Sequence, residues 1–180
     1  LEVEPLRFAP EAVDLVALVE RSLSGVEELI KGRDGSLSFE HPQAVWVHGD
    51  ASALALVIDN LIDNAVTYSD ASPHLEVALR AQGGMAWLGL RDRGVGFDPS
   101  TEDLLFRRFS RADTGRSGTG LGLALARAIA RGHGGQVHLS SEGTGRGAVA
   151  DLHADRTVRC ARSTGGACRF LPPGRPGRGG

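Results

Sequence analysis

Two asparagines near the middle of the chain, Asn60 and Asn64, are the first side chains whose spacing indicates chemistry. They are four residues apart in an apolar, helix-like run, so both side chains project from one face of a helix. An amide oxygen is a neutral ligand that suits magnesium, which prefers oxygen donors and keeps room for water and phosphates. The pair predicts a magnesium site, but two solvated helix asparagines would show the same spacing.

A carboxylate followed by two glycines forms a second candidate, in the segment Asp92-Arg93-Gly94-Val95-Gly96-Phe97. Asp92 ends a predicted strand, and the two glycines permit a tight turn and the close approach of a ligand. A carboxylate at this place can accept a hydrogen bond from an exocyclic amine such as that of adenine. Because the pattern is short, an ordinary turn between a strand and a loop is the alternative.

Three glycines, Gly118, Gly120 and Gly122, open a predicted helix. Free backbone N–H groups and the positive end of the helix can face a phosphate there. The spacing differs from the Rossmann fingerprint and from the Walker loop, and the Lys-Ser/Thr ending of the Walker loop is missing. The segment predicts a phosphate-binding helix start, with a flexible N-cap as the alternative.

Apolar periodicity indicates the elements that must position these residues. Helices are predicted at Pro10–Lys31, from the capping Asp50 to the turn at Ser69–Pro73, and at Leu121–Arg131. Strands are predicted at Ser36–Glu40, Ala44–His48, Leu75–Ala81, Met85–Asp92, Gln136–Ser141 and Ala148–His153, and a loop at Gly94–Thr119. Helices mixed with hairpins predict an α+β fold, a two-layer sandwich with a mixed, mostly antiparallel sheet.

Charge divides the chain into two parts. From Ala154 onward there are six arginines and one acid, which leaves 14 basic and 21 acidic residues before that point. We expect one domain over residues 1–153 and a basic, disordered Gly/Pro/Arg-rich tail over 154–180, with Cys160 and Cys168 as free thiols. The acidic body argues against a nucleic-acid partner. We find no stretch long enough to span a bilayer and no signal peptide.

The order of the motifs resembles the histidine-kinase branch of the Bergerat (GHKL) ATPase superfamily over about Leu1–His153. Asp59–Ser69 looks like the N box, Asp92–Phe97 like the first glycine box, Leu105–Asp113 like the F box and Gly118–Leu123 like the second glycine box. The resemblance implies an ATP-binding domain that uses Mg²⁺.

The resemblance also implies roles for single residues. Asp92 would hold the adenine amine, Asn64 with Asn60 would hold magnesium, and Arg111 would reach the γ-phosphate, unless it is a solvated arginine. The implied catalytic residues are Asn60 and Arg111. The implied nucleotide-binding residues are Asn60, Asn64, Tyr68, Asp92, Gly94, Gly96, Gly118, Thr119, Gly120, Leu121 and Gly122.

A lid over the nucleotide is implied at Asp98–Ser117. It contains few apolar residues and is followed by Gly118, so we expect it to be mobile when empty. Phe106 and Phe109 would form one apolar edge that docks when nucleotide orders the lid. Alternatively, both rings anchor the loop to the core at all times.

Three departures from the family pattern bear on affinity and turnover. Thr67 stands where the family usually has Lys or Arg. Arg146-Gly147-Ala148 replaces the usual Thr-Thr-Phe, and the closing strand ends in Leu152-His153 rather than Leu-Pro.

The residue at position 60 distinguishes the possible reactions. ATP hydrolases and serine kinases of the superfamily carry a glutamate base there, whereas Asn60 cannot act as a base near neutral pH. A neutral imidazole already has a nucleophilic lone pair, so Asn60 favours phosphate transfer to histidine.

The histidine acceptor itself is missing, because none of the six histidines lies in a sequence like the family's acceptor box. We therefore expect a longer parent, a homodimer with a dimerisation and phosphoacceptor domain, a response regulator as the next partner, and a monomeric isolated chain. We expect a cytoplasmic location, as part of a membrane-anchored sensor. The alternatives are a non-catalytic nucleotide-sensing or interaction module and, less favoured, a stand-alone ATPase.

Overall fold

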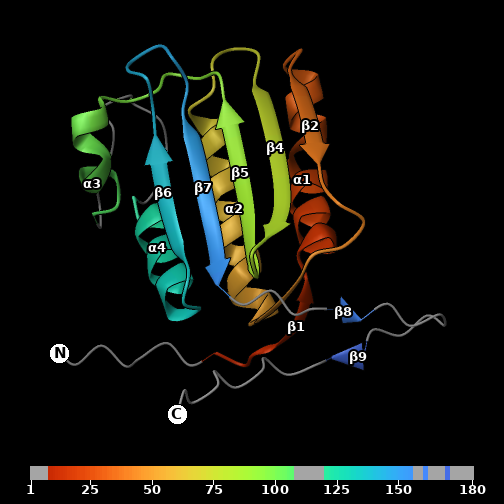
Figure 1. Ribbon diagram of the computed structural model, residues 1–180. Helices are drawn as coiled ribbons and strands as arrows, with labels where there is room; N and C mark the ends of the chain where they lie inside the picture. Colours follow the sequence, from red (N-terminus) through yellow and green to blue (C-terminus); the bar gives the residue numbers. More distant parts are fainter. Residues whose placement is uncertain (1–7, 108–119, 156–159, 162–168, 171–180) are drawn as a thin grey trace.

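A five-stranded sheet with helices on one face forms the body of the protein (Figure 1). The computed structural model describes residues 8–107, 120–155, 160–161 and 169–170. The sheet has the order β2 (Ser36–Glu40), β4 (His74–Gln82), β5 (Met85–Asp92), β7 (Val149–Asp155) and β6 (Gln136–Ser140). β2 and β4 are parallel and the other pairs are antiparallel. The predicted two-layer α+β sandwich is confirmed.

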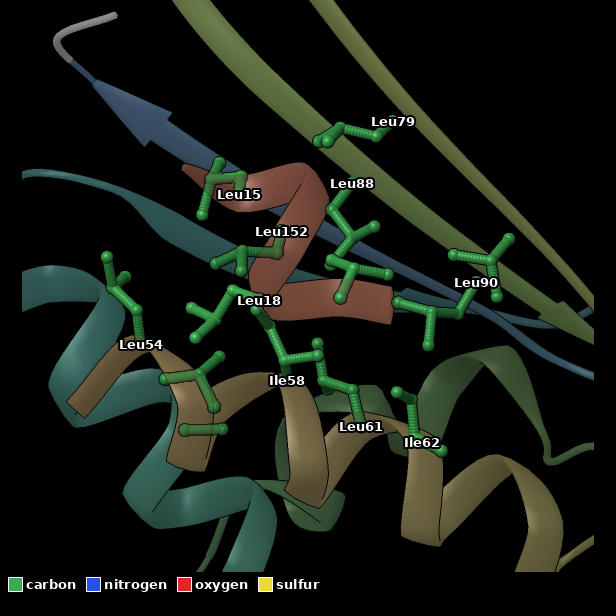
Figure 2. Packing of buried hydrophobic residues seen from close by; sticks show 14 of the residues in the cluster. Leu15, Leu18, Leu54, Ile58, Leu61, Ile62, Leu79, Leu88, Leu90 and Leu152 are labelled. Carbon is green, nitrogen blue, oxygen red and sulfur yellow. The ribbon is translucent and has the colours of Figure 1, made fainter. Parts of the chain in front are cut away.

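Three helices cover one face of this sheet: α1 (Leu15–Gly32), α2 (Ala51–Thr67) and α4 (Gly122–Gly132). Alternate residues of β5 point into the core, so Leu88 and Leu90 are buried whereas Trp87 is exposed. Figure 2 shows the side chains of α2 directed toward those of the sheet. The labelled members of this core are Leu15, Leu18, Leu54, Ile58, Leu61, Ile62, Leu79, Leu88, Leu90 and Leu152. Burying each contributes about 1.5–3 kcal/mol.

The first predicted helix begins later than expected. Residues Glu11–Asp14 form a strand, β1, which pairs antiparallel with β3 (Trp46–Gly49). Asp14 then caps α1, because its Oδ1 accepts a hydrogen bond from the N–H of Val16 at 3.0 Å. The prediction of a helix from Pro10 was wrong because a distant strand partner decides the conformation of this segment.

Helix α2 begins where it was predicted to begin. Asp50 is its N-cap, and the Oδ1 of Asp50 accepts from the N–H of Ala53 at 2.9 Å. The strand predicted at Ala44–His48 is shifted to Trp46–Gly49. In the described part of the chain, no helix combines the length and hydropathy needed to cross a membrane.

Two regions contain more structure than predicted. The segment predicted as a loop contains a 3₁₀ turn, η1 (Pro99–Thr101), and a short helix, α3 (Glu102–Leu105). Strand β7 extends to Asp155, and β8 (Cys160–Ala161) pairs with β9 (Arg169–Phe170) in the segment expected to be disordered. Cys168 and most of that tail lie outside the described residues, so the division at residue 153 stays a prediction.

Candidate nucleotide site

The carboxyl end of β5 meets the carboxyl end of α2, and this junction collects several predicted site residues. Tyr68 ends α2, and its N–H donates to the carbonyl of Asn64 at 2.9 Å. The carbonyl of Tyr68 accepts from the N–H of Val95 at 2.9 Å. A Cβ at Gly94 would collide with the same carbonyl, so glycine is required for the loop after Asp92 to pack on the helix end.

Asp92 is held rigidly at this junction with an exposed fraction of 9%. Its Oδ1 accepts from the N–H groups of Gly94 at 2.8 Å and Ala148 at 3.2 Å. Among the described residues, no hydrogen bond reaches Oδ2, so this oxygen can accept from a ligand. Burial raises the pKa of Asp92 and the charge of Asp70 adds to the rise, although the two backbone hydrogen bonds act in the opposite direction.

The two asparagines of α2 present their amide oxygens away from their own helix backbone. The Nδ2 of Asn60 donates to the carbonyl of Leu56, and the Nδ2 of Asn64 donates to the carbonyl of Asn60, both at 2.7 Å. These bonds occupy the amide nitrogens and leave the oxygens as acceptors. The donor set therefore fits a hard cation such as Mg²⁺.

The first turn of α4 lies directly against Asn60. The amide oxygen of Asn60 occupies the space that a Cβ at Gly122 would take. Gly120 has a φ of 66°, and α4 begins without a side-chain cap at Leu121, which is 37% exposed. The uncapped N–H groups of this turn can face a phosphate. The fold thus brings the predicted magnesium ligand beside the predicted phosphate-binding helix start.

Some predicted residues cannot be placed in this way. Gly118, Thr119 and Arg111 lie outside the described residues. Gly96 is described, but a Cβ at this position would meet the loop between β6 and β7, so the glycine allows this loop to pack closely rather than facing open space. Its predicted role in nucleotide approach stays a prediction.

The beginning of the predicted lid is anchored to the core. Phe106 is 7% exposed, and the guanidinium carbon of Arg127 in α4 lies 4.3 Å from the centre of its ring. Arg127 also donates to Asp103 at 3.2 Å, and Glu102 accepts from the N–H of Leu139 in β6 at 3.2 Å. Phe106 therefore packs against the core, and whether its ring docks only when nucleotide orders the lid stays a prediction. Phe109 lies outside the described residues.

Ser141 and Ala148 also belong to the site, although the sequence did not predict them there. Ser141 was assigned to a strand, but β6 ends at Ser140 and Ser141 opens the following loop. Its position two residues before the first of Gly143, Gly145 and Gly147 was the available signal. The hydroxyl of Ser141 accepts from the N–H of Phe97 in the segment that follows β5, and the N–H of Ala148 donates to Asp92 at the end of β5.

Comparison with known families and proteins gives consistent matches. The family model described as histidine kinase-, DNA gyrase B-, and HSP90-like ATPase matches residues 49–158. The sensor-like histidine kinase SenX3 of Mycolicibacterium smegmatis is 34% identical over 140 residues, covering 75% of this chain and 36% of the relative. The histidine-protein kinase/phosphatase MprB of Mycobacterium avium is 31% identical over 170 residues, covering 92% and 29%. The chain spans about a third of the length of these curated relatives.

Solved structures agree with these matches. The mycobacterial sensor histidine kinase MprB superimposes with a TM-score of 0.71 at 28% identity, over 83% of this chain and 98% of that one. A full-length ShkA structure in complex with AMPPNP has a TM-score of 0.79 at 20% identity, over 88% of this chain and 34% of that one, and supports the fold alone.

Proposed function

Since the chain belongs to the family of histidine kinase-, DNA gyrase B- and HSP90-like ATPases and is a domain of the sensor-histidine-kinase type, we propose that it binds ATP with Mg²⁺ and donates the γ-phosphate to a histidine on a separate dimerisation domain. The observation that carries the proposal is the buried Asp92 carboxylate, with one oxygen held by two backbone N–H groups and the other, as far as the described residues show, left to accept.

Adenine recognition is assigned to Asp92. A buried carboxylate oxygen with no competing donor among the described residues is an acceptor for the exocyclic amine. Tyr68 and Gly94 form the junction that holds the loop of Asp92 against α2. Adenine binding at this place would use an orientation of Asp92 that two backbone hydrogen bonds fix.

The phosphates are assigned to the first turn of α4 and the magnesium ion to Asn64 and Asn60. The ion would neutralise phosphate charge when bound. Gly120, Leu121 and Gly122 supply backbone N–H groups at the helix start, and Gly118 and Thr119 are proposed to extend this set. Arg111 is proposed to reach the γ-phosphate.

Transfer to histidine rather than to water follows from the side chain at position 60. Asn60 has no basic group that could take a proton from an attacking water. Its amide nitrogen donates a hydrogen bond to the carbonyl of Leu56. A neutral imidazole needs no such base to attack phosphorus. The partners we propose are the dimerisation domain of a homodimeric parent and then a response regulator, with the chain on the cytoplasmic side of a membrane-anchored sensor.

The test combines binding and transfer. Calorimetry with ATP should show magnesium-dependent binding that Asn64→Ala weakens at least tenfold, about the effect of losing 1.4 kcal/mol. The matched control is Ser52→Ala, an exposed residue at the other end of the same helix, which should bind as the parent does. With γ-labelled ATP and a separately purified dimerisation domain that carries the family's histidine acceptor box, the label should appear on that domain as acid-labile phosphate.

Two results would contradict the proposal in different ways. ATP binding that does not depend on magnesium, or that survives Asn64→Ala unchanged, would remove the assigned metal site. Tight magnesium-dependent binding without any transfer would instead favour the alternative of a nucleotide-sensing module, consistent with Thr67 in place of the family's Lys or Arg.

A further inference from the structure

The loop after β5 and the loop before β7 are joined along their backbones. The N–H of Asp92 donates to the carbonyl of Ala148 at 3.0 Å, and the N–H of Ala148 returns to the Oδ1 of Asp92 at 3.2 Å. Further along, the N–H of Gly147 donates to Gly94 at 3.0 Å and that of Gly145 donates to Val95 at 2.7 Å. The carboxylate of Asp92 is therefore oriented by the β6–β7 loop as well as by its own.

One hydroxyl, that of Ser141, lies at the centre of this junction. Its Oγ accepts from the N–H groups of Phe97 and Gly143, each at 3.2 Å, and donates to the carbonyl of Gly147 at 2.7 Å. The carbonyl of Gly143, at 3.1 Å, is a second possible acceptor. A hydroxyl has one proton and two lone pairs, so this side chain uses its full hydrogen-bonding capacity on the two loops.

The segment that Ser141 holds is rich in glycine, and keeping it ordered has an entropic cost. Gly143, Gly145 and Gly147 have φ angles of 123°, 79° and 72°, a conformation that glycine adopts freely and loses entropy to keep. Gly96, at φ 58°, fits against this loop because a Cβ there would meet the Ser141 hydroxyl and the carbonyls of Gly143 and Gly147. The Ser141 hydroxyl therefore adds a side-chain anchor, beside the backbone hydrogen bonds of Gly145 and Gly147, to a glycine-rich loop whose next residue, Ala148, donates to Asp92.

We propose that Ser141 is a positioning residue for adenine recognition, which fixes the β6–β7 loop so that Asp92 meets the exocyclic amine in one orientation. This inference rests on the proposed function, in which Asp92 accepts that amine. Ser141 acts through Gly147 and Ala148 and is not assigned any contact with nucleotide. Preorganisation of this kind raises affinity because the ordering cost is met before binding.

The consequence is a specific effect on base selectivity. Inosine triphosphate has a carbonyl where ATP has the amine, so an oriented carboxylate favours ATP and opposes the analogue. Loosening Asp92 should lower the affinity for ATP while changing the affinity for the analogue little, because the phosphate interactions are shared. A general loss of structure would weaken the binding of both nucleotides together.

The experiment is calorimetry of the 180-residue chain with Mg-ATP and Mg-ITP. Ser141→Ala should reduce the preference for ATP by about two- to tenfold, the range expected for one net hydrogen bond. Ser141→Thr retains the hydroxyl and should restore most of the preference. Ser140→Ala is the matched control, because Ser140 is the exposed preceding residue in β6, and it should leave the preference unchanged.

A double-mutant comparison separates positioning from general damage. In an Asp92→Asn background, Ser141→Ala should change the preference by less than about twofold, since the group it positions has been altered. Equal weakening of both nucleotides, or an undiminished effect of Ser141→Ala in that background, would overturn the role of Ser141. Binding of ATP by the parent without any effect of Asp92→Asn would overturn the proposed function and this inference with it.

A second measurement covers the case in which Ser141→Ala does not fold. In the unmodified chain without nucleotide, hydrogen exchange at the amides of Phe97 and Gly143 should already be slow, because the hydroxyl accepts from both. Rapid exchange at both amides that slows only after Mg-ATP is added would show that the junction forms with the ligand, and would overturn the proposal.

Discussion

Replacing Asp92 by asparagine should weaken ATP binding and stabilise the empty protein. The two backbone N–H groups that donate to Asp92 both reach Oδ1, and an amide oxygen can accept from both, although more weakly than a carboxylate does. The substitution therefore keeps the local hydrogen bonds and removes a buried negative charge. It also places an amide nitrogen, which is a donor, where the adenine amine needs an acceptor.

The effect on stability has a definite dependence on pH. Because burial raises the pKa of Asp92 above 3.8, the folded protein holds this proton more tightly than the unfolded chain does. The associated stability is fully present below the unfolded pKa and is lost as the pH rises through the folded pKa. An asparagine side chain does not titrate and has no such loss. The stability of Asp92→Asn relative to the parent should therefore increase as the pH rises from below about 3.9 toward neutrality.

The binding effect can be estimated from the bond that is lost. A hydrogen bond to a charged group contributes about 1.5–3 kcal/mol, which corresponds to roughly 10- to 150-fold in Kd. The matched control is Glu28→Gln, which removes an exposed charge from α1 and should leave the ATP affinity unchanged. A variant that is more stable and binds more weakly cannot be explained by misfolding.

Urea unfolding between pH 3 and 7 and calorimetry with Mg-ATP measure the two effects. The chain has two tryptophans to report unfolding. The reasoning is refuted if Asp92→Asn binds ATP as tightly as the parent. It is also refuted if the variant is less stable than the parent at pH 7, or if the difference in stability between them does not grow as the pH rises.

Three further predictions address the reaction, the anchored lid base and the stability of α1. The isolated chain should hydrolyse ATP very slowly and should not transfer radiolabel from γ-labelled ATP to its own histidines. Acid-labile radiolabel on any of its six histidines would contradict the roles given to Asn60 and to a separate acceptor. Arg127→Ala should speed hydrogen exchange at Glu102–Phe106 about two- to fivefold, because it removes a cation–π contact of about 0.5–1 kcal/mol, and unchanged exchange would show that Arg127 does not anchor α3. Gly25→Ala should stabilise the protein by about 0.5–1 kcal/mol in urea unfolding, since Gly25 is exposed in α1 with open space around it, and a loss of stability would contradict that geometry.

The family and the sandwich could be predicted because their signals are local and ordered along the chain. The apolar spacing of α2, the cap at Asp50 and the hairpin at Gly83-Gly84 each involve residues close in sequence, and all three are confirmed. The start of α1 was missed for the opposite reason. Residues Glu11–Asp14 fit a helical period, but their pairing with Trp46–Gly49 cannot be read from their own sequence.

For the candidate site too, the sequence predicted the residue types, whereas their contacts with distant segments were seen only in the structure. Side-chain chemistry identified Asn60, Asn64 and Asp92 as candidates, and the structure places Asn60 against Gly122 and Asp92 beside Ala148. Anchoring of Phe106 to the core was an alternative from the sequence, but its contact with Arg127 was not predicted, since the two residues belong to separate elements.

The sequence by itself determined the residue types of the motifs, their order and the helices and strands that carry them, because caps, turns and periodic apolar positions act over a few residues. The tertiary structure decided which of those residues meet. The hydroxyl of Ser141 joins a loop 44 residues earlier in the chain to its own loop. Such a contact depends on the packing of the whole sheet and its helices, and its energy is not encoded in any short segment.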